Sequence, residues 1–206
     1  MTTRIKFCGL TRIEDVRAAV ALGVDAIGFV FARRSRRFVE PGHAAALRDA
    51  LPPFVSAVAL FMDDEPDWIE QVIGAVRPDL LQFHGEETPP FAARFARPYL
   101  KAVPMASVGD AAAYARRYAD ARGFLLDSHA SGGAGGSGTV FDWSAVPRLP
   151  RPVVLAGGLD AGNVAQAIAQ VKPYAVDVSS GIELAPGLKD AAKMRAFVEA
   201  VRAADR

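Results

Sequence analysis

Short apolar runs alternate with polar segments along the whole chain. Most of these runs are continuously apolar, which is typical of parallel strands that are covered on both faces. They recur about every 24 residues, enough for a strand, a helix and two short loops, because a parallel crossover needs a dozen or more residues. We expect strands at Ile5–Cys8, Ala26–Phe31, Ala57–Phe61, Leu80–Phe83, Tyr99–Val103, Phe124–Asp127, Val153–Ala156 and Ala175–Val178.

The segments between these runs have the periodicity of helices. Thr11 with Glu14 fits a capping box at a helix start, and Pro66 suits the first turn of another helix. Between the sixth and seventh expected strands, residues 128–140 are mostly Gly, Ser and Ala, so only a short helix around Asp142–Val146 is expected. Apolar stripes at helical spacing are formed by Ile69, Val72, Ile73 and Val76 and by Met194, Phe197, Val198 and Val201.

Eight strand–helix units indicate an α/β fold, a single (β/α)8 TIM barrel with a short or irregular sixth helix. A doubly wound open sheet is the alternative for the same order of elements. No linker or break in composition divides the 206 residues. We therefore expect residues 1–206 to form one domain.

The bulk composition excludes several classes of protein. Hydrophobic residues make up 51% and charged residues 23%, and Lys+Arg 24 against Asp+Glu 23 leaves a formal charge of +1. This balance does not indicate a nucleic-acid or membrane partner. No apolar run approaches the roughly 18 residues of a membrane helix, and the polar start Met1–Arg4 does not resemble a signal peptide. A single cysteine excludes an internal disulfide, so we expect a cytoplasmic protein.

Reactive side chains stand at the ends of two expected strands. Cys8 ends the first and Asp127 the sixth, and in a barrel the loop side of every strand faces one common mouth. The two would then act across one pocket as general base and general acid. Cys8 must lower its pKa from about 8.5 or act through its small thiolate fraction, and Asp127 must raise its pKa. Taken alone, each is more simply a buried small residue or a loop cap.

The ends of the last two strands indicate a phosphate site. Gly157-Gly158, followed by an expected helix near Ala161, and Ser180-Gly181 let backbone amides converge on an anion. These are the loops that usually bind phosphate in this fold. The alternative is a pair of tight turns. The glycine-rich stretch 132–138 is either a lid whose amides reach the same phosphate or a surface connector.

No metal site is expected from the sequence. His43, His84 and His129 lie far apart and lack ligand spacing. We interpret His84 as structural or pocket-lining. Asp177, within the last strand, is either a buried network carboxylate or a second carboxylate at the mouth, and we favour the network.

Together these motifs resemble phosphoribosylanthranilate isomerase from the first strand to the last helix. The matching segments are Lys6-Phe7-Cys8-Gly9-Leu10-Thr11, Gly28-Phe29-Val30-Phe31 with Ser35 and Arg37, Gln82-Phe83-His84-Gly85-Glu86, Leu126-Asp127, Gly135-Gly136-Ser137-Gly138 with Phe141-Asp142-Trp143, Ala156-Gly157-Gly158-Leu159 with Asn163-Val164, and Val176-Asp177-Val178-Ser179-Ser180-Gly181-Ile182-Glu183.

The resemblance implies a cofactor-free Amadori rearrangement of N-(5-phosphoribosyl)anthranilate in tryptophan biosynthesis. It implies that Cys8 is the general base, that Asp127 is the general acid, and that Arg37 pairs with the anthranilate carboxylate. The family often has proline where Arg36 stands, so either Arg36 or Arg37 could hold that carboxylate. The phosphate site implied by the match consists of Gly136, Ser137, Gly157, Gly158, Ser180 and Gly181.

Two rival functions remain at this point. One is another sugar-phosphate isomerase or epimerase on a phosphate-binding barrel, which the fold alone does not exclude. The related histidine-pathway enzymes use a pair of aspartates, whereas Cys8 occupies the first position here. The other is a non-catalytic phosphate-binding module, which the acid–base pair argues against. The expected partner is a phosphorylated small molecule, and the protein is a monomer or a homodimer.

Overall fold

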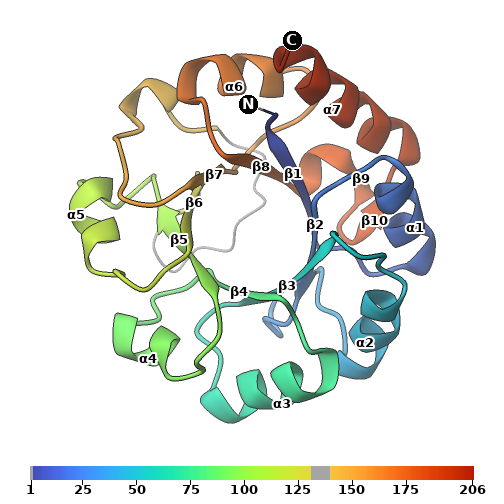
Figure 1. The fold of residues 1–206 in the computed structure, drawn as a ribbon, viewed down its shortest axis with the longest axis vertical. Helices are drawn as coiled ribbons and strands as arrows, with labels where there is room; N and C mark the ends of the chain where they lie inside the picture. The colour runs from blue at the N-terminus through green and yellow to red at the C-terminus, as the bar shows by residue number, and fades with distance from the viewer. Residues whose placement is uncertain (1, 131–139) are drawn as a thin grey trace.

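The computed structural model describes residues 2–130 and 140–206. Eight parallel strands form a closed barrel in which each strand pairs with the next along the chain and β8 pairs with β1 (Figure 1). The strands are β1 Arg4–Cys8, β2 Ala26–Val30, β3 Ser56–Phe61, β4 Leu80–Phe83, β5 Tyr99–Pro104, β6 Gly123–Asp127, β7 Val153–Leu155 and β8 Ala175–Val178. The predicted barrel is confirmed, and the open sheet is wrong.

Helices surround this barrel on the outside (Figure 1). They are α1 Ile13–Ala21, α2 Pro41–Asp49, α3 Pro66–Val76, α4 Pro89–Ala93, α5 Ala111–Arg116, α6 Val164–Val171 and α7 Ala191–Ala204. Among the described residues between β6 and β7, only a 3-10 helix, η1 Trp143–Ala145, forms. The expectation of an irregular sixth helix is therefore correct. Among the described residues, no helix is long and apolar enough to cross a membrane.

Alternation along the strands divides the apolar side chains into two layers. In β1, Ile5 and Phe7 face the helices, and Phe7 packs edge-on against Phe197 of α7 at 6.1 Å between ring centroids. The opposite face of each strand lines the barrel interior. The apolar interior consists of Leu100, Ala102, Leu125, Val154, Ala156 and Ala175. Lys6 and Cys8 lie on this inward face of β1, so an ammonium group and a thiol also line the barrel interior.

The predicted capping box at Thr11 and Glu14 is wrong. Helix α1 begins at Ile13 after Arg12, without a side-chain cap. The Thr11 hydroxyl instead donates to the carbonyl of Gly187 at 2.7 Å. A tertiary partner has replaced the local one, because a small hairpin lies against this side of the barrel mouth.

That hairpin follows β8 and was not predicted. The 3-10 helix η2, Ser180–Ile182, leads into β9, Glu183–Ala185, which pairs antiparallel with β10, Leu188–Lys189. The helix expected near Ala161 begins later, at Val164, because the Asp160 side chain accepts from the amides of Gly162 and Asn163 and forms a turn.

Candidate functional site

The carboxyl ends of the strands enclose a pocket that contains both predicted catalytic residues. Cys8 from β1 and Asp127 from β6 line it together with Arg37. The remaining lining residues are Val30, Ala32, Ser35, Leu60, Met62, Gln82, His84, Asp177 and Ser179. The barrel therefore brings together a thiol and a carboxylate that are more than a hundred residues apart.

Cys8 lies at the buried end of β1, with 5% of its surface exposed. Gly28 on the neighbouring strand leaves room for the thiol, since a Cβ there would lie 2.9 Å from Cys8 Sγ. Burial raises the pKa of the Cys8 thiol, and this effect exceeds the opposing attraction of Lys6. Near neutral pH Cys8 is therefore protonated. This is opposite to the lowered pKa that the sequence argument favoured for a base.

A buried ion pair lies next to Cys8 inside the barrel. Lys6 stands two residues before Cys8 on the same face of β1, and its Nζ donates to Asp177 Oδ1 at 2.8 Å. Lys6 and Asp177 are direct neighbours in the β1–β8 register that closes the barrel. Burial would lower the pKa of Lys6, but Asp177 and Cys8 raise it. Asp177 is thus a network carboxylate, as favoured, and it also lines the pocket.

Two histidine rings flank Asp127. The His129 amide donates to Asp127 Oδ1 at 3.0 Å, and its ring Nδ1 lies 3.1 Å from the same oxygen. His84 Nε2 lies 3.9 Å from Asp127 Oδ2, and the two imidazoles stack at 4.4 Å. Burial lowers the pKa of His84 to about 3, so this ring is neutral.

Asp127 is ionised in the empty pocket. Burial would raise the pKa of this carboxyl, but hydrogen bonding from His129 and the electrostatic influence of the two nearby imidazoles lower it overall. The sequence argument required a raised pKa for a general acid, so the empty pocket does not satisfy it. The difference arises because both histidines approach Asp127, which spacing along the chain did not reveal.

The same three side chains also offer metal-ligating atoms within 4.8 Å of one another. His84 and His129 are far apart in the sequence, and they meet here because β4 and β6 end at the same mouth. Contacts within the protein hold these side chains: Gln82 Nε2 lies 3.1 Å from His84 Nδ1, and the backbone amide of His129 donates to Asp127. We therefore interpret the histidines as partners of the carboxylate.

A second pocket adjoins the first at the ends of β7 and β8. Asp127 and Asp177 line both pockets, and Gly157, Gly158 and Ser180 line the second. Gly157 and Gly158 have φ of +80° and +66°, and a Cβ at Gly157 would lie 2.5 Å from the Ser128 amide nitrogen. Four of the predicted phosphate residues are thus adjacent, because Gly181 follows Ser180. Gly136 and Ser137 lie outside the described residues.

Gly181 has a different role from its neighbours. A Cβ at this position would overlap the carbonyl oxygen of Leu159. Its bare backbone therefore lets the loop after β8 pack directly against the loop after β7. Gly181 does not line the pocket, but it determines how closely the two loops beside the pocket approach each other.

The geometry distinguishes the two candidate arginines. Arg37 lines the pocket, whereas Arg36 is exposed and does not. Arg37 Nε and Nη2 donate to Glu183 Oε1 and Oε2 at 2.9 and 2.7 Å. Sequence reasoning missed Glu183, although the residue stood in a quoted motif.

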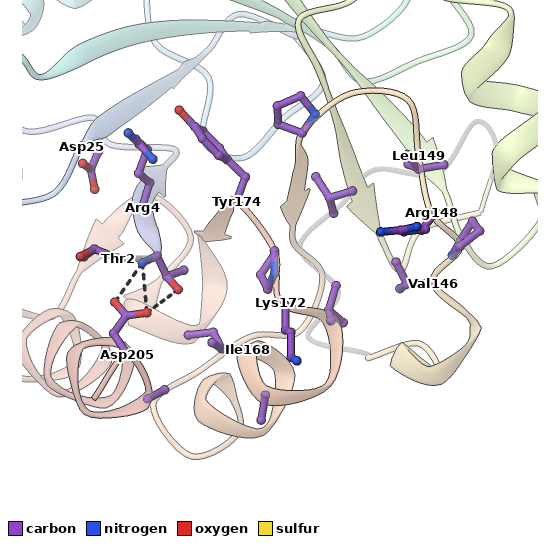
Figure 2. Close-up of a pocket in the computed structure, with 18 residues that line it drawn as sticks. Thr2, Arg4, Asp25, Val146, Arg148, Leu149, Ile168, Lys172, Tyr174 and Asp205 are labelled. Atoms are coloured by element: carbon purple, nitrogen blue, oxygen red, sulfur yellow. Dashed lines mark hydrogen bonds between the residues drawn. The ribbon is translucent and has the colours of Figure 1, made fainter.

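A larger hollow, of about 1310 Å³, lies at the opposite end of the barrel, where the strands begin (Figure 2). Arg4, Lys172 and Tyr174 are among its lining residues. Asp205 also lines this hollow. Its Oδ1 and Oδ2 accept from the Thr3 amide at 3.0 and 2.9 Å, as dashed lines in the figure show. Neither predicted catalytic residue lines this hollow, and active sites of this fold lie at the other end of the strands.

The chain is similar to known proteins over nearly its whole length. The family profile of N-(5'phosphoribosyl)anthranilate (PRA) isomerase matches residues 5–200. N-(5'-phosphoribosyl)anthranilate isomerase of Xanthomonas oryzae pv. oryzae is 54% identical over 210 residues, covering 98% of this chain and 95% of that protein.

Two solved structures are similar over nearly the whole chain. One is phosphoribosyl anthranilate isomerase in complex with reduced 1-(o-carboxyphenylamino)-1-deoxyribulose 5-phosphate, with a TM-score of 0.86, 36% identity and coverage of 98% of this chain and 100% of that chain. The other comprises monomers generated from the dimeric enzyme of Thermotoga maritima, with a TM-score of 0.82, 34% identity and coverage of 98% and 99%. The profile match and the identity over 98% of its length show that the chain belongs to the N-(5'-phosphoribosyl)anthranilate isomerase family.

Proposed function

We propose that the mouth of the barrel is the active site in which this chain isomerises N-(5'-phosphoribosyl)anthranilate in tryptophan biosynthesis. The observation that carries the proposal is that Cys8 and Asp127 line one pocket, while Asp127 also lines the adjoining glycine-rich pocket. One substrate can therefore place its phosphate against the loops after β7 and β8 and its reacting carbons between the thiol and the carboxylate.

Asp127 acts as the general acid in the first step. Its carboxyl proton passes to the furanose ring oxygen as the bond between C1' and that oxygen breaks. The nitrogen lone pair forms the C1'=N bond, which gives an open-chain iminium ion. The positive charge acidifies the proton on C2'.

Cys8 acts as the general base in the second step. Its thiolate takes the C2' proton, and the electrons of that C–H bond form C1'=C2' while the C=N electrons return to nitrogen. The enolamine then gains a proton at C1' and loses its 2'-hydroxyl proton, giving 1-(2-carboxyphenylamino)-1-deoxyribulose 5-phosphate. Electrons balance without a redox partner, so we propose that no cofactor takes part.

The two anionic ends of the substrate meet different parts of the mouth. Amides of Gly157, Gly158 and Ser180 are available to a phosphate, and Arg37 is available to the anthranilate carboxylate. The phosphate next to Asp127 adds negative charge, which raises the pKa of that carboxyl when substrate binds. Binding thus brings the general acid closer to its protonated form.

The assignment is tested by following anthranilate fluorescence while the purified protein acts on freshly prepared substrate. Rapid loss of the substrate signal without added cofactor is the expected result. A folded protein with no turnover would overturn the assignment. The histidine-pathway substrate serves as the comparison, and we expect it not to react.

We also propose that residues 1–206 act as one catalytic domain in the cytoplasm, as a monomer or a homodimer. The formal charge of +1 and the single cysteine support this proposal, as does the dimeric enzyme named for Thermotoga maritima. Sedimentation of the purified protein measures the oligomeric state.

Cys8 should react with iodoacetamide only at alkaline pH. Because burial raises the pKa of the thiol, the midpoint of the rate-against-pH curve is expected above about 8.5, the ordinary thiol value. The chain has a single cysteine, so mass spectrometry reports this site alone. A midpoint near pH 7 or below would show that the empty pocket already holds a thiolate.

Gly181→Ala should weaken phosphate binding more than it slows the chemistry. The added methyl group forces the loops after β7 and β8 apart, because it overlaps the Leu159 carbonyl oxygen. We expect KM, and the inhibition constant of inorganic phosphate, to rise about tenfold or more. Gly74→Ala is the control, since a Cβ there meets no atom within 4 Å. Equal inhibition constants in Gly181→Ala and the wild type would contradict the prediction.

A further inference from the structure

We propose that Glu183 and Lys189, on the hairpin β9–β10, are positioning residues that hold Arg37 for the carboxylate of the substrate. The inference rests on the proposed function and extends it to two buried charged residues that take no part in the proton transfers. Glu183 and Lys189 have 4% and 0% of their side-chain surface exposed. Burying two charged groups is costly unless they are paired and hydrogen-bonded, so the contacts of this ion pair indicate what it holds in place.

Glu183 fixes the plane of the Arg37 guanidinium. Both carboxylate oxygens are used, one by Nε and one by Nη2, at 2.9 and 2.7 Å. Such a paired contact restricts rotation of the guanidinium far more than a single hydrogen bond does. The Nη1 donors belong to neither contact, so that edge of the guanidinium is available to a second carboxylate.

The stem of Arg37 is fixed as well. A Cβ at Gly9 would lie 2.6 Å from Arg37 Cδ, so the arginine side chain crosses directly over the residue after Cys8. The Ser35 hydroxyl oxygen accepts from the Arg37 amide at 3.1 Å. The guanidinium is therefore placed beside the catalytic thiol by contacts to the backbone and to the side chain of Arg37.

Lys189 joins this arginine clamp to the catalytic strand. Its Nζ donates to Glu183 Oε1 at 2.7 Å and to the backbone carbonyl of Cys8 at 2.6 Å. It also donates to the carbonyl and hydroxyl oxygens of Ser179 at 3.1 and 3.3 Å. One ammonium group thus connects the arginine clamp, the end of β1 and the end of β8.

The charge of the cluster suits an anionic substrate. Burial would raise the pKa of Glu183, but the Arg37 hydrogen bond and Lys189 lower it, so the carboxylate is ionised between two cations. Burial lowers the pKa of Lys189, and Glu183 opposes that shift; with this ammonium protonated, Arg37, Glu183 and Lys189 together carry one net positive charge. Glu183 therefore orients Arg37 without cancelling the attraction that the cluster exerts on the substrate carboxylate.

Glu183→Gln tests the proposal with two compounds. The substrate carries the anthranilate carboxylate, and N-(5'-phosphoribosyl)aniline, used as a competitor, lacks it. We expect KM for the substrate to rise about tenfold or more, with kcat changed less than about threefold and the inhibition constant of the aniline compound nearly unchanged. Equal weakening of both compounds would indicate a merely structural role and would overturn the proposal.

A fall in KM would overturn it in another way, because Glu183 would then compete with the substrate for Arg37. Glu87→Gln is the matched control, since it breaks another buried ion pair, Glu87 with Lys101 at 3.0 Å, outside both pockets. This variant should lose stability without distinguishing the two compounds. If Glu183→Gln does not fold, Glu183→Asp carries the test, because it keeps the charge but its side chain is one methylene too short to reach both Arg37 donors.

Turnover by the wild-type protein distinguishes failure of the proposed function from failure of the positioning role of Glu183 and Lys189. A wild-type protein without turnover would reject the proposed function itself. Normal wild-type turnover with no difference between the two compounds in the Glu183 variants would reject only the positioning role.

Discussion

Replacing Asp127 by asparagine should lower kcat by about 10²- to 10⁴-fold, the usual contribution of a positioned general acid. The amide has nearly the same shape and keeps its place beside the stacked rings of His84 and His129, so the pocket remains formed. It cannot deliver a proton to the ring oxygen, and the furanose therefore stays closed. KM should change little, because the phosphate loops and Arg37 are intact.

The measurement is steady-state kinetics by anthranilate fluorescence, with thermal unfolding of each variant. Asp64→Asn is the matched control, because this half-buried carboxylate also follows a strand but does not line the pocket with Asp127. We expect its kcat to stay within about twofold of the wild type. If Asp127→Asn keeps more than a tenth of the wild-type kcat, the acid is another group, and Asp177 is then the first to examine.

Cys8→Ser should lower kcat to a similar extent, but at the next step. A hydroxyl is a much weaker acid than a thiol, so the variant has no anion to remove the C2' proton. Asp127 is still present, and the ring can open. The iminium ion therefore accumulates on this variant, whereas it does not form on Asp127→Asn.

Reduction with cyanoborohydride during turnover measures this difference. We expect the reduced open-chain amine from Cys8→Ser and not from Asp127→Asn, with mass spectrometry as the readout. Cys8→Ala is the control for residual hydroxyl chemistry, and it should match Cys8→Ser within a few-fold. A Cys8→Ser enzyme with near-normal kcat would remove the thiol from the mechanism.

The sequence was sufficient to predict the barrel, since continuous apolar runs at a regular interval have few alternative arrangements. The bounds of β4 and β8 agree with those expected, and each of the other strands differs by one residue at one end. Strand ends set the positions of Cys8 and Asp127, so their meeting in one pocket was also predictable. The capping-box prediction was wrong because the Thr11 hydroxyl donates instead to the carbonyl of Gly187, 176 residues away.

What could not be predicted depends on contacts between distant segments. β9 and β10 have three and two residues, too few to show any periodicity. The link from Arg37 to Glu183 spans 146 residues, and nothing in one sequence identifies that pair. The inward orientation of Lys6 was predictable, because it lies two residues before Cys8 on the same strand and therefore on the same face.

The protonation of the empty pocket has a consequence for the direction of the reaction. Cys8 holds its proton and Asp127 has lost its own, which is also the state in which a forward turnover leaves them. In the proposed mechanism this is the form that the reverse reaction uses. A forward cycle of that mechanism would begin with the loss of a proton from Cys8 and the gain of one by Asp127, either between them or by exchange with water.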